Sequence, residues 1–264
     1  MTMELNELTA ISPVDGRYGS KTAAFRDLFS EYGLIKHRVL VEVRWFQALA
    51  NNAMISEVPK LDNDALTILN DIVDNFSLAD AERIKTIERT TNHDVKAVEY
   101  YIKTAFKDLG LDKFKEFIHF GLTSQDINNT SVPLSLKDSH QLVLQPLLEK
   151  LVTKINLLAF EWKDISMLAR THGQPASPTK LGKEIYVFTE RIENQLDLLK
   201  TIPFSGKFGG ATGALNAHVI AYPQIEWEEF ADNFLNKKLK IHRQKTTTQI
   251  EHYDFMAAYF DNLR

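Results

Sequence analysis

The sequence predicts a mainly α-helical protein, and three observations support this prediction. The 264 residues include only 11 Gly and 8 Pro, and these cluster, so that long stretches contain no helix breaker. Apolar residues recur at helical spacing in these stretches. Two series of residues also alternate steps of four and three, which is the heptad spacing of helices that pack lengthwise in a bundle. The series are Leu144, Leu148, Leu151, Ile155, Leu158, Trp162 and Leu181, Ile185, Phe188, Ile192, Gln195, Leu199.

Composition excludes several classes of protein. With 44% hydrophobic and 25% charged residues and a net charge of −4, the chain is typical of a globular protein. Acidic residues outnumber basic ones by 35 to 31, which argues against binding of nucleic acid. The absence of cysteine excludes disulfides, thiolate metal sites and cysteine nucleophiles. No apolar stretch is long enough for a membrane span, and Glu4 and Glu7 interrupt any signal peptide, so we expect a cytoplasmic protein.

The first part of the chain, residues 1–117, is predicted to form an N-terminal helical domain. Ser77 followed by Asp80 has the spacing of a capping box, which marks the start of a helix. Gly110 is expected to end another helix. The predicted helices cover residues 21–52, 62–75, 79–88, 93–108 and 113–120.

Residues 118–264 are predicted to form the first part of a long-helix bundle. One helix is expected from Ser124 to about Lys163, with kinks at Pro133 and Pro146. A polar turn, THGQPASP, should lead to a second long helix that starts with Ser177 as N-cap and Pro178 at its first position.

The end of the sequence carries three further expectations. The segment SGKFGGATGALNAH, with four glycines in nine residues, predicts a tight hairpin or an irregular loop. Helices are expected near 226–237 and from about Gln249. The sequence ends at FDNLR without a helix stop signal, so we expect that this last helix is cut in mid-course, although Arg264 would also suit a natural helix end.

Four segments concentrate polar and reactive side chains at predicted helix starts or turns. They are DGRYGS (15–20), RTTNHDVKAVE (89–99), HFGLTSQDINN (119–129) and RTHGQPASP (170–178). Free N–H groups at a helix start can bind an anion or carboxylate, although Asn92 and Ser124 could instead be simple N-caps. His172 lies in a turn, where a histidine is often just solvated, but its near-neutral pKa also suits acid–base catalysis.

These segments resemble the adenylosuccinate lyases of the aspartase/fumarase superfamily, and the bacterial branch in particular. The resemblance covers the whole chain in order. HGQPA also occurs in relatives such as argininosuccinate lyase, whereas DGRYG and TTNHDVKAVE are more specific. The matching segments are SPVDGRYG, KTIERTTNHDVKAVEY, EFIHFGLTSQDINN, ARTHGQPASPTKLGKE and the NAH of GATGALNAH.

The resemblance implies a function and an assembly. Members of this family eliminate fumarate from adenylosuccinate, giving AMP, and from SAICAR, giving AICAR, in purine biosynthesis. They use no metal or organic cofactor. They consist of three helical domains around a tetrameric core of long helices, so a homotetramer is implied for the complete protein, and each active site is assembled from three subunits.

The resemblance also implies roles for individual residues. The elimination needs a base, charge stabilisation of the intermediate and an acid for the departing nitrogen. His172 corresponds to that acid, and His119 and His93 to the family's other catalytic histidines. The implied substrate-binding residues are Arg17, Tyr18, Asn92, His93, Asp94, Thr123, Ser124, Thr171 and Gln249. Lys96, Asn216 and His218 are implied to support the site from outside.

Two alternatives remain open at this point. The chain could belong to another fumarate-releasing lyase of the superfamily, which would bind argininosuccinate or fumarate but no purine nucleotide. It could also be a non-catalytic helical scaffold whose polar segments only cap helices. A scaffold would have no need for Arg17, Tyr18, His93, His119 and His172 together.

The resemblance predicts that the 264-residue chain alone releases no fumarate from adenylosuccinate. The family's base is a serine in a segment S-S-x-M-P-x-K-x-N-P, and this sequence contains no such segment. Proximity cannot replace a missing proton acceptor. The check is a fumarate assay by chromatography on purified chain from a host that lacks the enzyme. Measurable turnover would contradict the assignment of the base.

Overall fold

The computed structural model describes residues 11–108 and 110–264. Glu4 and Glu7, on which the argument about a signal peptide depends, lie outside the described residues. Two compact units are present: unit 1 consists of Met1–Asp138 and Phe204–Tyr253, and unit 2 of Ser139–Pro203 and Asp254–Arg264. The predicted domain boundary after residue 117 stays a prediction.

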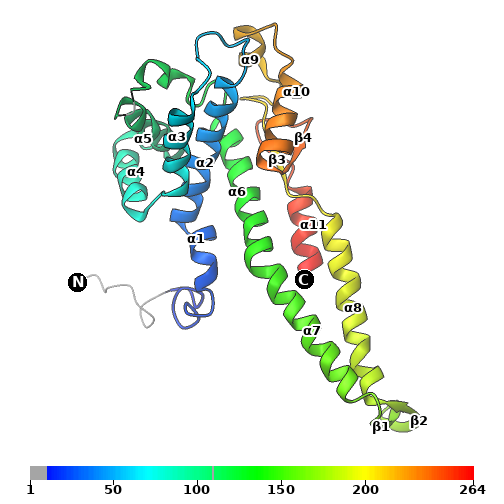
Figure 1. Cartoon of the computed structure of the whole chain (residues 1–264). Coiled ribbons are helices and arrows are strands. Elements are labelled where there is room, and N and C mark those ends of the chain that lie inside the picture. Colours follow the sequence, from blue (N-terminus) through cyan, green and yellow to red (C-terminus); the bar gives the residue numbers. More distant parts are fainter. Residues whose placement is uncertain (1–10, 109) are drawn as a thin grey trace. The chain divides into compact units, whose positions relative to one another are not determined.

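Unit 1 begins with three helical segments where the sequence predicted one. A short 3-10 helix, Ala23–Phe25, and α1, Arg26–Phe29, precede α2, Glu31–Ala50 (Figure 1). The predicted continuous helix over 21–52 is therefore wrong. The reason is Ser30, whose backbone is extended and whose side chain accepts a hydrogen bond from the Gly33 N–H at 3.2 Å, so that it caps a new helix.

The next four helical segments of unit 1 agree closely with the sequence. They are α3 (Asn63–Asp74), α4 (Leu78–Thr91), α5 (Asp94–Asp108) and a 3-10 helix (Asp112–Phe117). The capping box formed by Ser77 and Asp80 is confirmed at the start of α4. Asn92 ends α4 in the left-handed conformation, with φ of 51°, so the alternative in which it is an N-cap is wrong.

The remaining elements of unit 1 come from two distant stretches of sequence. They are α6 (Ser124–Ser139), β3 (Ser205–Lys207), α9 (Asn216–Ala221), α10 (Trp227–Asp232), a π-helix (Asn233–Leu239) and β4 (His242–Gln244). β3 pairs in parallel with β4, and the glycine-rich segment after β3 is an irregular loop that leads into α9. The predicted helix near 226–237 corresponds to α10 and the π-helix. Pro133 lies inside α6.

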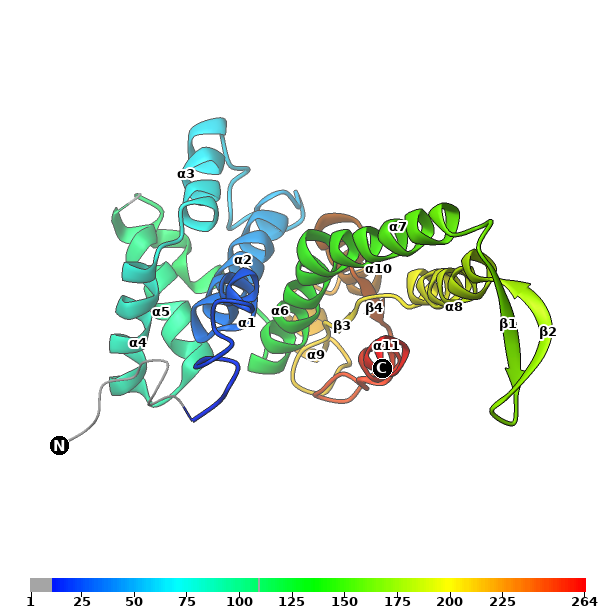
Figure 2. The same ribbon diagram turned by 90° about the horizontal axis from the view of Figure 1, so that it is seen from below.

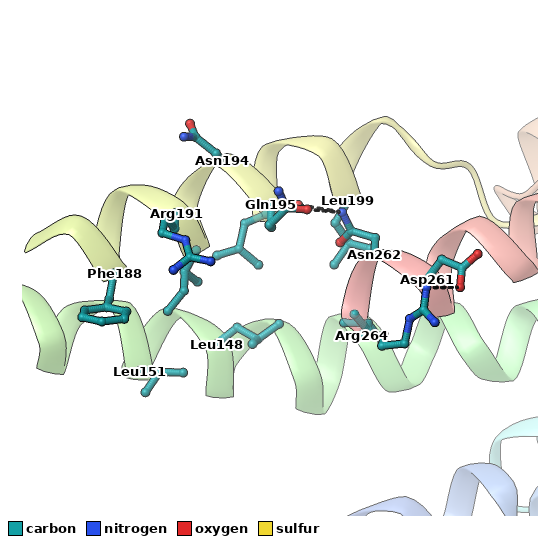
Figure 3. Close-up of a pocket in the computed structure, with 13 residues that line it drawn as sticks. Leu148, Leu151, Phe188, Arg191, Asn194, Gln195, Leu199, Asp261, Asn262 and Arg264 are labelled. Atoms are coloured by element: carbon teal, nitrogen blue, oxygen red, sulfur yellow. Dashed lines mark hydrogen bonds and ion pairs between the residues drawn. The ribbon is translucent and has the colours of Figure 1, made fainter. Parts of the chain in front are cut away.

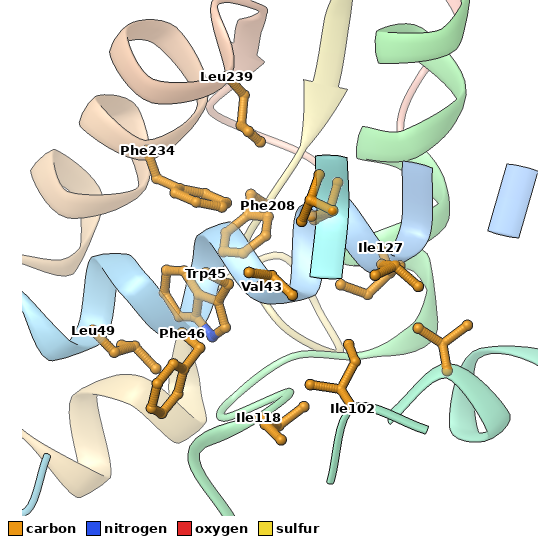
Figure 4. Packing of buried hydrophobic residues seen from close by; sticks show 14 of the residues in the cluster. Val43, Trp45, Phe46, Leu49, Ile102, Ile118, Ile127, Phe208, Phe234 and Leu239 are labelled. Carbon is orange, nitrogen blue, oxygen red and sulfur yellow. The ribbon is translucent and has the colours of Figure 1, made fainter. Parts of the chain in front are cut away.

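The hydrophobic core of unit 1 is built around α2. Figure 4 shows Val43, Trp45 and Phe46 of this helix among side chains of other elements. The Trp45 ring packs edge-on against Phe208 and Phe234, with centroids 4.8 and 5.2 Å apart. Because these partners come from the stretch 204–253, α2 holds the two stretches of unit 1 in one core.

Unit 2 is a pair of long helices with a small hairpin at one end. A π-helix, His140–Leu144, leads into α7, Gln145–Glu161, and α8 spans Leu181–Thr201. α7 and α8 pack along each other (Figures 1 and 2), which confirms the lengthwise pairing predicted from the heptad spacing. Pro146 lies in the first turn of α7, directly after the π-helix.

The connection between α7 and α8 is a β-hairpin, not the predicted simple polar turn. β1, Ser166–Thr171, pairs antiparallel with β2, Gln174–Lys180. Ser177 and Pro178 lie in β2 and α8 begins only at Leu181, so the predicted helix start is wrong. A two-stranded hairpin has free edges, where a proline without an N–H is tolerated.

The last helix, α11, spans Asp254–Leu263, so the predicted start at Gln249 is also wrong. α11 contacts α8 within unit 2. Across the described residues, none of the helices combines the length and the apolar character needed to cross a bilayer.

The α7–α8 contact predicts the effect of a substitution at Gly182. A Cβ at this position would lie 2.2 Å from the Ala159 carbonyl oxygen and 2.6 Å from Cα of Lys163, and both are backbone atoms that cannot turn away. Gly182→Ala should therefore lower the free energy of unfolding by about 1–3 kcal/mol. Urea denaturation followed by circular dichroism measures this, with Lys183→Ala, at an exposed neighbour, as control. Equal midpoints for wild type and Gly182→Ala would contradict the contact.

Candidate active site

The starts of α5 and α6 bring two predicted site residues together. His93 directly precedes α5, and its Nδ1 accepts a hydrogen bond from the Lys96 backbone N–H at 3.0 Å. Because Nδ1 is an acceptor, neutral His93 carries its proton on Nε2. Nε2 lies 3.4 Å from the Ser124 hydroxyl oxygen, which is then the acceptor. His93 and Ser124 are thus in contact within one chain, whereas the resemblance implied that the residues of one site come from three subunits.

Asp94, the first residue of α5, is bound by a buried arginine. Arg38 of α2 donates from one terminal nitrogen to Asp94 at 2.6 Å and from Nε to Asn128 at 2.9 Å. Burial alone would raise the pKa of Asp94, but the charge of Arg38 and the hydrogen bonds from Arg38 and the Val95 N–H together lower it. Asp94 is therefore an ionised acceptor at neutral pH.

A pocket of about 460 Å³ opens beside these residues. It combines the guanidinium of Arg38, which is paired with Asp94, and the imidazole of His93 with three carboxylates, so its walls carry both donors and acceptors. Its lining residues are Glu31, Leu34, Arg38, Glu88, Asn92, His93 and Asp94. Three predicted substrate-binding residues, Asn92, His93 and Asp94, therefore share one pocket.

His119 lies in the loop between the 3-10 helix and α6, with φ of 62°. Its Nδ1 is 2.5 Å from Oε1 of Glu42, a fully buried residue of α2. Burial of the ring opposes its charged form, but the hydrogen bond and charge of Glu42 outweigh this and raise the pKa of His119. Trp45 donates from Nε1 to the Phe120 carbonyl at 3.0 Å and so fixes the same loop.

The N-terminus of α6 is tied to the glycine-rich loop by a buried ion pair. Asp126 accepts hydrogen bonds from the backbone N–H groups of Thr123, at 2.8 Å, and of Gly209, at 2.8 Å. Its carboxylate is 2.9 Å from Nζ of Lys207, and both side chains are fully buried. Asp126 therefore sets the position of Thr123 and, through it, of Ser124.

His218 of α9 packs against the loop before α6. The residue is fully buried, and a Cβ at Gly121 would lie 2.5 Å from its ring. Burial lowers the pKa of His218 to about 4, so the ring is neutral at physiological pH. Neither ring nitrogen has a hydrogen-bond partner among the described residues. Such a group acts through packing against the loop that contains Gly121.

Other predicted residues of unit 1 are exposed and outside this cluster. The Arg17 guanidinium lies over the Tyr18 ring, 5.4 Å from its centroid. Gln249 is exposed in the segment before α11, and Asn216 accepts a hydrogen bond from Thr212 at 3.0 Å. Within the described ranges, no hydrogen bond or ion pair joins Arg17, Tyr18 or Gln249 to the cluster around His93.

Thr171 and His172 belong to unit 2, where they lie at the apex of the β1–β2 hairpin. Both are exposed. His172 and Gly173 have φ of 49° and 79°, as the two central residues of a type I′ turn require. His172 is therefore an exposed residue of the two-residue turn that joins β1 to β2 in unit 2.

Unit 2 also contains a pocket of about 650 Å³ between α7, α8 and the end of α11 (Figure 3). Leu148 and Leu151 of α7, Phe188 of α8 and Arg264 line it. None of the predicted site residues does. In the part of the chain that the structure describes, no group of three or more His, Asp and Glu side chains has the arrangement of a metal site.

Four buried charged residues that position the site were not predicted from the sequence: Arg38, Glu42, Asp126 and Lys207. A signal for two of them was present. Arg38 and Glu42 are four residues apart within the largely apolar α2 segment LIKHRVLVEVRWF, and so lie on one face of this helix. Charged residues are rarely buried without a specific partner.

The burial of His218 predicts a pH dependence of stability. The unfolded chain takes up a proton near pH 6.5, whereas folded His218 does so only near pH 4. Stability from this residue is therefore present above pH 6.5 and is lost as the pH falls toward 4, by about 3 kcal/mol. Urea denaturation between pH 7 and 4.5 should show a smaller loss for His218→Gln, which cannot titrate. Identical pH profiles would contradict the neutral buried ring.

Comparisons with known proteins agree with this architecture. A family model described as Lyase matches residues 16–264. Adenylosuccinate lyase of Escherichia coli strain K12 is 51% identical over 260 residues, which cover 98% of this chain and 57% of that relative. Adenylosuccinate lyase of Dictyostelium discoideum is 50% identical over 270 residues, with the same shares covered. The chain thus spans 57% of the length of these curated relatives.

Solved structures share the fold. A fumarate lyase from Mesorhizobium sp. BNC1 matches with a TM-score of 0.71 and 21% identity, over 91% of this chain and 53% of that one. A beta-carboxy-cis,cis-muconate cycloisomerase from Acinetobacter calcoaceticus sp. ADP1 matches with a TM-score of 0.67 and 21% identity, over 91% and 53%. The predicted helical, aspartase/fumarase-like fold is confirmed, and the match over residues 16–264 shows that the chain belongs to this lyase family.

Proposed function

We propose that this chain acts in an adenylosuccinate lyase, which eliminates fumarate from adenylosuccinate and from SAICAR. The observation that carries the proposal is the identity of about half of all residues, over 98% of the chain, with adenylosuccinate lyases from a bacterium and from Dictyostelium discoideum. The aligned 98% of the chain includes the segments that hold every predicted site residue.

The arrangement of side chains supports this chemistry. The pocket beside His93 offers the imidazole and the Arg38 guanidinium as hydrogen-bond donors, next to three carboxylates. Ser124 adds a hydroxyl next to His93, and Thr123 is held beside it by Asp126. A substrate with one phosphate and two carboxylates needs several such groups.

His172 is proposed to protonate the departing nitrogen. The type I′ turn holds the imidazole at the exposed apex of a hairpin, where it can enter a site formed by other parts of the protein. Histidine is the side chain that most often acts as a general acid or base. We propose that the sites are completed in a cytoplasmic homotetramer, in which subunits contribute different segments.

A hybrid enzyme tests the proposed function. In the hybrid, this chain replaces the matching 57% of the adenylosuccinate lyase of Escherichia coli strain K12. The hybrid should release fumarate from adenylosuccinate, and His172→Ala should lower kcat by about 10²–10⁴-fold, as expected for loss of a positioned general acid.

The matched control is Lys200→Ala, which removes an exposed charge of α8 that pairs with Asp197. It should leave kcat unchanged. A folded, tetrameric hybrid that releases no fumarate would contradict the proposed function. Full activity of His172→Ala would contradict the role of His172 alone.

A further inference from the structure

Glu42 is a buried acid that the proposed reaction does not account for. It lies in the middle of α2, and its side chain is fully inaccessible to solvent. Burial of an ionised carboxylate is costly unless a cation or hydrogen-bond donors compensate. A glutamate that only completed a hydrophobic core would be better replaced by an apolar residue, so its contacts call for an explanation.

The only hydrogen-bond partner of Glu42 among the described residues is His119. Oε1 accepts from Nδ1 of the ring at 2.5 Å, and Oε2 has no partner. The His119 side chain retains 17% exposure, whereas Glu42 has none. The buried carboxylate therefore holds the inner edge of a ring whose other edge reaches solvent.

The chemistry of the pair determines which ring nitrogen of His119 carries the proton. An ionised carboxylate can only accept, so Nδ1 must carry a proton. Nε2 has no hydrogen-bond partner in the described part of the chain, and it is not among the buried unpaired atoms. We infer that Glu42 is a positioning residue that orients His119, fixing the proton on Nδ1 and presenting Nε2 to the substrate.

The surrounding negative charges also raise the pKa of His119. His119 faces Glu42 from α2, Glu99 from α5 and Asp126 from α6, and all three favour the imidazolium form. The backbone of His119 also supports a fixed orientation, because its left-handed φ of 62° is uncommon for a residue other than glycine. The loop is anchored next to it by the bond from Trp45 to Phe120.

Only the claim that Nε2 of His119 contacts the substrate rests on the proposed function. The orientation and protonation of His119 are properties of the chain itself. Carboxylate–histidine pairs recur where a protein must set the tautomer and basicity of an imidazole, as at metal ligands and in hydrolase triads. Glu42 would serve the same purpose here without touching the substrate.

The experiment is a titration of the 264-residue chain, ¹⁵N-labelled at histidine and followed by NMR. His119→Gln assigns the signals of His119. In the wild type, neutral His119 should carry its proton on Nδ1. Glu42→Gln retains an amide oxygen that can accept from Nδ1 but removes the charge, so the measured pKa of His119 should fall by about 1–3 pH units.

Glu31→Gln is the matched control, because Glu31 lies on the same helix but is exposed and pairs with Lys85. It should leave the pKa of His119 unchanged. An unchanged pKa in Glu42→Gln, or a neutral wild-type ring protonated on Nε2, would overturn the inference. The tautomer is measured on the wild-type chain and does not depend on the Glu42→Gln variant. The inference therefore stays testable even when Glu42→Gln does not fold. An inactive hybrid with Nδ1-protonated His119 would contradict the proposed function and leave the role of Glu42 intact.

Discussion

The burial of most of α2 is the constraint on which unit 1 depends. Its apolar side chains form the centre of the core, and the Trp45 ring contacts residues from the distant stretch 204–253. The polar groups on the buried part of such a helix need hydrogen-bond partners. Two of them, Arg38 and Glu42, have their partners among the residues of the candidate site.

Arg38 and Glu42 show how the core positions the site. They lie one helical turn apart, and each buried side chain binds one predicted site residue. Arg38 binds Asp94 at the start of α5, and Glu42 binds His119. Because both charges are buried, moving either partner would leave an uncompensated ion. The packing of α2 thus orients two partly exposed side chains of the candidate site.

The buried pair of Asp126 and Lys207 does the same for the loops. The Asp126 carboxylate joins the backbone before α6 to the glycine-rich loop after β3, which are more than 80 residues apart in sequence. His218 fills the space under Gly121. In the glycine-rich loop, a Cβ at Gly213 would lie 2.3 Å from the Thr247 carbonyl oxygen, and one at Gly209 would lie 2.8 Å from the Gly213 carbonyl oxygen. These positions have no room for a side chain, which explains the composition of the loop.

The sequence by itself determined the helical fold, most helix positions, the capping box of α4 and the histidines to consider, because these depend on local periodicity and on motifs. It could not give the break at Ser30, where capping outweighs an unbroken apolar stripe, or the β1–β2 hairpin, which depends on pairing between strands. The partners of Arg38, Glu42 and Asp126 were decided by the tertiary structure alone. A charge within an apolar stripe signals a buried partner, but which residue supplies it depends on the contacts made when distant segments pack together.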